Sequence, residues 1–154
     1  MSRPTASALD RTAIETFLET QSVGTLSLAK ENESYAIPVS FTFAREQDDF
    51  YFRLGYAPES RKREYIEATD RGTLVVAAAT DAGWQSVVAR GPLEHCNTVE
   101  NPGRVAPADR SVSDAAHERN IPYDHVFEAP SDAWFTLVRL RTDELTGVRE
   151  ASDG

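Results

Sequence analysis

The sequence predicts a mainly β fold with minor α content, a six-stranded antiparallel barrel with flanking helices. Strand-like segments follow one another through mostly short connections rather than as alternating βαβ units. The longest segment, residues 84–96, is interrupted by Gly91 and Pro92, which favours the bend or bulge that barrels use at their corners. A chain of 154 residues, 40% of them hydrophobic, is long enough for one domain with a real core, so we expect a single domain over residues 1–154.

Two helices are expected beside the strands. Asp10 is a suitable N-cap, and Ile14, Phe17 and Leu18 follow it with the spacing of an apolar helix stripe. A second, short helix is predicted over about residues 58–69, because a proline suits its first turn.

Six segments are predicted to be strands: residues 23–29, 35–43, 50–54, 73–80, 84–96 and 133–142. In the second of them, large apolar side chains alternate with the small ones of Ala36, Pro38, Ser40 and Thr42, which leaves a face on which a flat molecule could lie. Pro38 has no N–H to donate and therefore indicates an edge strand or a bulge. The fourth segment is almost entirely apolar and is expected to be a central, buried strand.

Two further segments are not expected to be strands. Residues 97–132 hold four of the eight prolines and few large apolar residues, which is typical of a lid, a partner contact or a mobile loop. Residues 143–147 are expected to form a turn near the end of the chain.

A basic triplet, Arg61, Lys62 and Arg63, stands at the predicted start of the second helix. It has two interpretations. In the first, the triplet is part of a solvated helix face, and nearby glutamates such as Glu64 and Glu67 are its intrahelical partners. Alternatively it binds an anion, because a helix N-terminus and two or three cations together favour a phosphate group.

Composition limits the classes of function. Twenty-five acidic residues outnumber 16 basic ones, only two of which are lysine, and the formal net charge is −9. Such an acidic, lysine-poor surface resembles those of proteins from salt-loving (halophilic) archaea, and it argues against general nucleic-acid binding. The single Cys96 excludes an internal disulfide, and no Cys/His spacing indicates a metal site. Because there is no long apolar run or signal-peptide core, we expect a cytoplasmic protein that does not contact membranes.

Four stretches, in this order, resemble one known family: "YAIPVSFTF", "DDFYFRLGYAPESRKREYI", "GTLVVAAA" and "WQSVVARGPLEH". The pattern is similar to that of the FMN-binding split-barrel proteins related to pyridoxamine 5'-phosphate oxidase. The small single-domain branch, which includes nitroimidazole-resistance-type flavoproteins, is the most similar. The resemblance implies a split β-barrel and a homodimer with FMN in a cleft between the subunits.

The resemblance also implies which residues bind the cofactor. The basic pair that opens the helix, here Arg61 and Lys62, holds the phosphate, and the strand before it, here Arg53 and Leu54, lines the ribityl chain and phosphate. The P-V-x-F strand, here Val39, Ser40 and Phe41, presents main-chain groups to the isoalloxazine ring. A polar residue of the long strand, here Ser86, contacts the flavin. Arg63 is expected to be merely solvated.

The expected function is that of an FMN-dependent oxidoreductase that acts on an unknown small molecule. The C-terminal stretch "RLRTDELTGVREASDG" lacks the Trp-, Arg- and His-rich region of the pyridoxamine phosphate oxidases, so oxidation of vitamin B6 is not expected. The alternatives are a non-catalytic flavin-binding or sensory module, a relative that binds deazaflavin or heme, and a barrel with no cofactor. The sequence identifies no catalytic residue.

The remaining aromatic and histidine residues have ordinary interpretations. Trp84 and Trp134 are expected in the core or at a dimer interface, with a wall beside the flavin as the alternative. His95 is expected to be structural. His117 and His125 lie in the irregular segment, where they could line a substrate mouth or coordinate a heme, although no ligand spacing supports this.

Overall fold

The structure is a computed structural model that describes residues 5–56, 60–100 and 134–151. Nine strands and two helices follow in this order: β1 (Thr5–Ala8), α1 (Arg11–Glu19), β2 (Val23–Lys30), β3 (Glu33–Ser40), β4 (Thr42–Ala44), β5 (Asp49–Tyr56), α2 (Arg61–Ala68), β6 (Arg71–Thr80), β7 (Gly83–Glu100), β8 (Trp134–Arg141) and β9 (Glu144–Ala151). The expected mainly β fold is confirmed.

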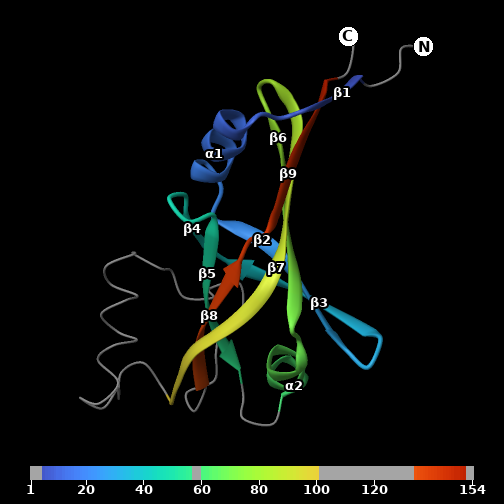
Figure 1. The fold of residues 1–154 in the computed structure, drawn as a ribbon. Helices are drawn as coiled ribbons and strands as arrows, with labels where there is room; N and C mark the ends of the chain where they lie inside the picture. Colours follow the sequence, from blue (N-terminus) through green and yellow to red (C-terminus); the bar gives the residue numbers. More distant parts are fainter. Residues whose placement is uncertain (1–4, 57–59, 101–133, 152–154) are drawn as a thin grey trace.

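All strand pairs are antiparallel, and the sheet is a split barrel rather than a closed one. The strand order is β3-β2-β6-β7-β8-β5-β4, with β9 paired to β7 and β1 paired to β9. The two ends of this order, β3 and β4, are consecutive in the chain and are separated only by Phe41, whose N–H donates to the Ser22 carbonyl oxygen at 3.0 Å. The covalent chain therefore joins the two ends of the sheet where ladder hydrogen bonds do not (Figure 1).

The strand count of six is wrong, for three physical reasons. The predicted strand 35–43 divides at Phe41 into β3 and β4, and β1 was not foreseen. The segment predicted as a turn, residues 143–147, instead begins β9. Gly147 suggested that turn, but it lies within the strand, where a Cβ atom would meet Ile14 Cγ1 at 2.9 Å and Leu9 Cδ1 at 3.0 Å. Its glycine identity thus reflects the close approach of α1 and not a turn.

The long strand β7 changes partners near the predicted break. It pairs with β6 and β9 before Leu93 and with β8 from Leu93 onward. At Gly91 a Cβ atom would lie 1.9 Å from the Arg141 carbonyl oxygen, so only glycine lets the two backbones cross there. The irregularity in register comes later, between His95 and Asn97. Pro38 lies on β3 at one end of the strand order, as expected for an edge strand.

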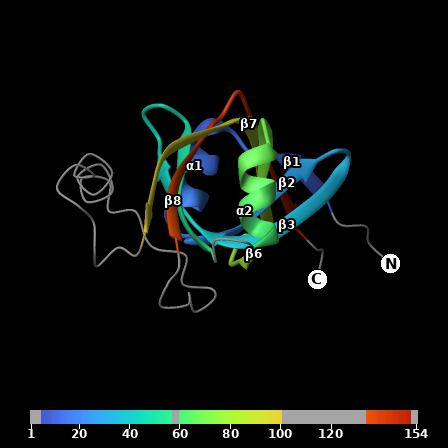
Figure 2. The same cartoon turned by 90° about the horizontal axis from the view of Figure 1, so that it is seen from below.

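The helices cover the barrel ends. In α1, the Asp10 side chain accepts from the Ala13 N–H at 2.8 Å, and Ile14, Phe17 and Leu18 are buried, as predicted. Figure 2 shows α2 lying across the opening of the ring of strands. No helix of the described residues is long and apolar enough to cross a membrane.

Candidate functional site

Exposed apolar side chains gather on one face of the sheet. The four large hydrophobic residues that are exposed in the described part of the chain are Val23 (48%), Val75 (37%), Trp84 (48%) and Val148 (38%). These residues lie on β2, β6, β7 and β9, and their side chains point away from the core. The strand register puts all four on the same side of the sheet, which we call the outer face. Single exposed hydrophobic residues are ordinary, but several that share one face of a sheet mark a contact surface.

This face corrects one expectation and narrows another. The strand β6 is central in the order, as predicted, but it is not buried on both sides, since Val75 is exposed. Trp84 is exposed, which excludes the core but leaves the dimer interface and the wall beside the flavin as predictions. The side chain of Trp134 lies outside the described residues, as do His117 and His125.

Two of the predicted flavin contacts lie on the outer face. Ser40 is the register partner of Val23, and Ser86 is the register partner of both Ala77 and Val148. Ser40 is 7% exposed, and Ser86 is half-buried. Because β2 and β6 separate their strands, the two serines are about 14 Å apart at roughly 4.8 Å per strand. One flavin ring edge cannot contact both within a single subunit.

Three predicted contacts have buried side chains. Val39, Phe41 and Leu54 belong to the hydrophobic core and are at most 4% exposed. For Val39 and Phe41 this agrees with the implied role, which uses main-chain groups only. The side chain of Leu54 packs inside the barrel, so any part it plays toward a ligand is also limited to its backbone.

The basic triplet opens α2, which begins three residues later than predicted. The Ser60 side chain caps the helix by accepting from the Arg63 N–H at 3.2 Å, so Arg61 and Lys62 occupy the first turn. The Lys62 ammonium donates to the Gly55 carbonyl oxygen at 3.0 Å and so lies at the end of β5. Arg61 is exposed and makes no hydrogen bond or ion pair within the described ranges.

The two glutamates of α2 form ion pairs with Lys30 and Arg63. Glu67 accepts from Arg63 at 2.9 Å, so Arg63 is part of the solvated helix face, as expected. Glu64 instead pairs with Lys30 from the β2–β3 hairpin, and the hydrogen bond from Lys30 lowers the pKa of the Glu64 carboxyl. The solvated-face interpretation therefore holds for Arg63, and the anion site at Arg61 and Lys62 stays a prediction. The charge of Arg61 also contributes to the lowered pKa of the Glu64 carboxyl.

The strand register brings Arg53 toward the same region. β4 pairs with β5 at Thr42 and Tyr51, and β3, which ends at Ser40, also contacts β5. Ser40 therefore lies near the level of Arg53, two residues beyond Tyr51, and Gly55 with its Lys62 contact follows on the same side of β5. Together with Arg61, which precedes Lys62 in α2, we group these residues as one row, and Ser86, three strands away from Ser40, lies outside it.

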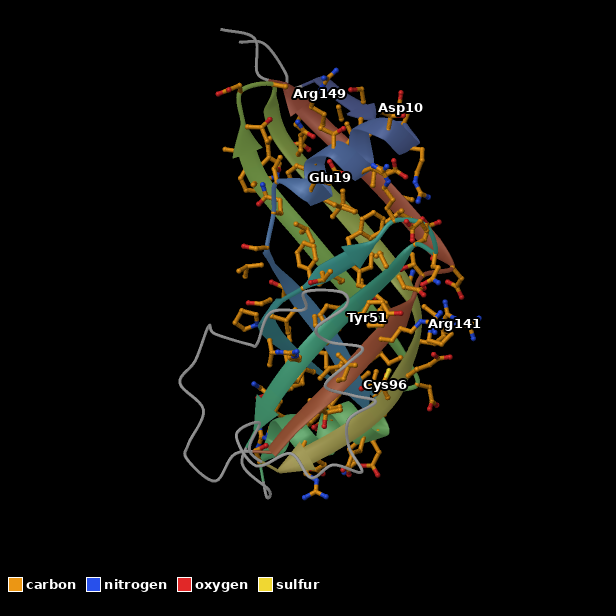
Figure 3. The ribbon with its side chains drawn as sticks, turned by 90° about the vertical axis from the view of Figure 1, so that its left-hand side faces the viewer. Asp10, Glu19, Tyr51, Cys96, Arg141 and Arg149 are labelled. Carbon is orange, nitrogen blue, oxygen red and sulfur yellow. The ribbon has the colours of Figure 1, made fainter. Side chains whose placement is uncertain are left out.

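Metal-binding chemistry has no counterpart in the described ranges, where no group of three or more His, Cys, Asp or Glu side chains is placed to hold an ion. His95 and Cys96 are exposed on β7 next to a register shift. Figure 3 shows Cys96 on the flank of the barrel, on the same side as Tyr51 and Arg141. The residues that sequence reasoning missed are Gly55, Ser60 and the outer-face valines, of which Val75 could have been found from the apolar residues on both faces of its strand.

The sequence matches the family model described as Pyridoxamine 5'-phosphate oxidase over residues 10–149. The chain belongs to the pyridoxamine 5'-phosphate oxidase family. No curated protein sequence matches it.

Solved structures share the fold of this family member at low sequence identity. A provisionally assigned pyridoxamine 5'-phosphate oxidase from Corynebacterium glutamicum is 18% identical with a TM-score of 0.67, over 100% of this chain and 98% of that chain. A FAD-binding protein from Mesorhizobium loti is 18% identical with a TM-score of 0.67, over 97% and 100%. A provisionally assigned 5-nitroimidazole antibiotic resistance protein from Bacteroides thetaiotaomicron is 15% identical with a TM-score of 0.58, over 99% and 93%.

Proposed function

We propose that the protein is an FMN-dependent oxidoreductase that works as a homodimer with the flavin between its subunits. The observation that carries this proposal is the row of Ser40, Arg53, Lys62 and Arg61 beside an exposed apolar sheet face. Membership in the family and the FAD-binding relative from Mesorhizobium loti support a flavin as the ligand.

The phosphate end fits the start of α2. Arg61 and Lys62 stand in the first turn, where bare cations oppose the helix dipole unless an anion lies near them. The N-terminal amides of this turn and the two side chains offer both dipole and charge to a phosphate. Arg53 stands two residues before Gly55 on β5 and suits the ribityl chain or the phosphate.

The apolar end fits a second subunit. A flavin ring against the backbone of Val39, Ser40 and Phe41 would leave one side open in a monomer. The outer face, with Val23, Trp84 and the other exposed hydrophobics, supplies the surface that a second copy would cover. In such a dimer Ser86 would meet the flavin of the other subunit, which accounts for its distance from Ser40.

The bound flavin would supply the redox chemistry, and the chain would bind, orient and shield it. The outer-face hydrophobics, once covered by the second subunit, would exclude water from the ring. No described residue is placed as a nucleophile or a general acid.

The test is the ligand that copurifies with the protein. We expect a yellow protein with FMN identified by mass spectrometry, and we expect the double variant Arg61→Ala, Lys62→Ala to be colourless and to take up no FMN. Arg63→Ala is the matched control, because Arg63 pairs with Glu67 and should not affect flavin content. A wild-type protein that fails to bind FMN, or that carries heme or a deazaflavin, contradicts the proposal. Turnover with NADH or NADPH and an electron acceptor then separates an oxidoreductase from a flavin-binding module.

A further inference from the structure

A separate pocket lies between the end of α1 and the edge strand β4. Its volume is about 500 Å³, and it is lined by Leu18, Glu19 and Gln21 on one side and by residues 41–46 on the other. β4 is the last strand in the sheet order, so one of its edges faces α1 rather than another strand. Figure 1 shows α1 ending close to β4, and Figure 3 shows Glu19 at that end of the helix. A pocket of this size is in the range used by small organic ligands.

The wall of the pocket is aromatic and fixed in place. Phe43 is half-buried and packs on the fully buried Phe50 with ring centroids 4.8 Å apart, and Phe41 meets Phe50 edge-on at 5.7 Å. Leu18 completes the apolar lining from α1. Phe43 is the partly exposed ring of this group, and because Phe50 holds it in place it offers aromatic surface without further ordering, which favours a planar ligand.

The charges at the rim are not balanced. Arg45 donates to Glu19 at 3.1 Å, and both side chains are more than half exposed, at 61% and 58%. The second carboxylate that lines the pocket, Glu46, has no ion-pair partner within the described ranges. The pocket therefore carries one uncompensated negative charge, next to an aromatic surface that also attracts cations.

We propose that this pocket binds a planar aromatic cation, such as an arylmethylamine or a protonated heteroaromatic compound. The ring lies against Phe43, and the positive group pairs with Glu46. Phe41 and Thr42 line the pocket and directly follow Ser40, so the ligand lies next to the stretch to which the flavin ring is assigned. Its role as the substrate pocket rests on the proposed function, whereas the binding of the cation does not.

The test uses 1-naphthylmethylamine, which is cationic at neutral pH, with the neutral 1-naphthalenemethanol and the anionic 1-naphthoate as comparison probes. Titration calorimetry on the full-length protein, with and without FMN, gives the dissociation constants. We expect the cation to bind most tightly and the anion least. Glu46→Gln should weaken binding of the cation about 5-fold, as expected for a partly exposed charge-assisted contact, and should leave the neutral probe unchanged.

Two further variants test whether the charge at the pocket rim determines the affinity for the cation. Arg45→Gln should tighten binding of the cation, because it releases the Glu19 carboxylate. Glu31→Gln is the matched control, since it makes the same charge change in the distant β2–β3 turn and should leave all three constants unchanged. These substitutions are on the surface, so folding does not confound them.

The proposal is overturned if no probe binds, if the anion binds best, or if Glu31→Gln has the same effect as Glu46→Gln. Chemical-shift changes in residues 41–46 on adding the amine are expected, and changes confined to other residues would also overturn it. If the amine binds here but FMN does not bind the protein, the cation-binding pocket is confirmed. In that case the proposed function is wrong, and so is the role of the pocket as a substrate site. If both bind, the amine should perturb the flavin absorption spectrum.

Discussion

The Lys62 ammonium donates to the Gly55 carbonyl oxygen at 3.0 Å and so ties the first turn of α2 to the end of β5. The two residues are separated by the short segment that the structure leaves undescribed, and the hydrogen bond fixes where the helix starts relative to the strand. The same ammonium is one of the two cations proposed to hold the phosphate. In the proposed site Lys62 would therefore serve both the fold and the ligand, whereas Arg61 would serve only the ligand.

This difference predicts separable effects of single variants. Lys62→Met should lower the free energy of unfolding of the flavin-free protein by about 1 kcal/mol, the usual net value of such a hydrogen bond, and should also weaken FMN binding. Arg61→Gln should weaken FMN binding without changing the stability of the flavin-free protein. Urea denaturation and FMN titration measure the two quantities. Equal stability losses in both variants would show that the Gly55 contact has no special role.

The outer face predicts the oligomeric state. Val75→Glu places a carboxylate on the face that a second subunit would cover, and by two-fold symmetry the change enters the interface twice. An unpaired buried charge costs several kcal/mol, so the variant should be a folded monomer by light scattering, whereas the wild type should be a dimer. Thr12→Glu, an exposed position on α1, is the control and should remain dimeric. A Val75→Glu protein with the mass of the wild type would place the interface elsewhere.

The crossing at Gly91 predicts unequal costs for two glycine substitutions. In Gly91→Ala the new Cβ would lie 1.9 Å from the Arg141 carbonyl oxygen, and this backbone atom moves only if the strands separate. We expect a loss of about 3 kcal/mol or more. In Gly72→Ala the nearest atom is Leu93 Cδ1 at 2.9 Å, the end of a flexible side chain, so the loss should be about 1 kcal/mol. Equal urea midpoints for the two variants would contradict the proposed backbone crossing.

Most of the fold could be predicted because it depends on local patterns. The apolar stripe of Ile14, Phe17 and Leu18 and the alternation in residues 35–43 are visible in the sequence and are confirmed. The division of that strand at Phe41 could not be predicted, because it results from a change of partner strand. Strand β9 was missed because glycine is typical of turns. The reason for a glycine at position 147 is the close approach of Ile14, a long-range contact that the local sequence does not show.

The site was less accessible to sequence reasoning. The position of Arg61 and Lys62 at a helix start followed from the local pattern, and α2 confirms it. Which glutamates would neutralise them could not be predicted, because Glu64 takes Lys30, 34 residues away, as its partner. The exposure of Val75 was also missed, since an apolar strand surface looks the same whether its own domain or another subunit covers it.

The pair of Arg71 and Asp143 predicts a component of acid sensitivity. Arg71 donates two hydrogen bonds to the Asp143 carboxylate, at 2.8 and 2.9 Å, and so joins the start of β6 to the turn before β9. These hydrogen bonds lower the pKa of Asp143 below its ordinary value of 3.8. Because the folded-state pKa is the lower one, the pair stabilises the fold above the unfolded-state pKa, and this contribution is lost as the pH falls through the folded-state pKa.

Asp143→Asn should therefore lower the Tm at neutral pH by a small amount, since both side chains are exposed. The difference from the wild type should stay constant from pH 7 down to about 4 and shrink as the pH falls further toward about 2, and it should also shrink in high salt, which screens exposed charges. Asp81→Asn is the control, because Asp81 lies in the exposed β6–β7 turn and makes no ion pair within the described ranges. Melting curves across this pH range measure the effect. A difference that stays constant over the whole of this range would mean that Asp143 acts through its turn geometry and not through its charge.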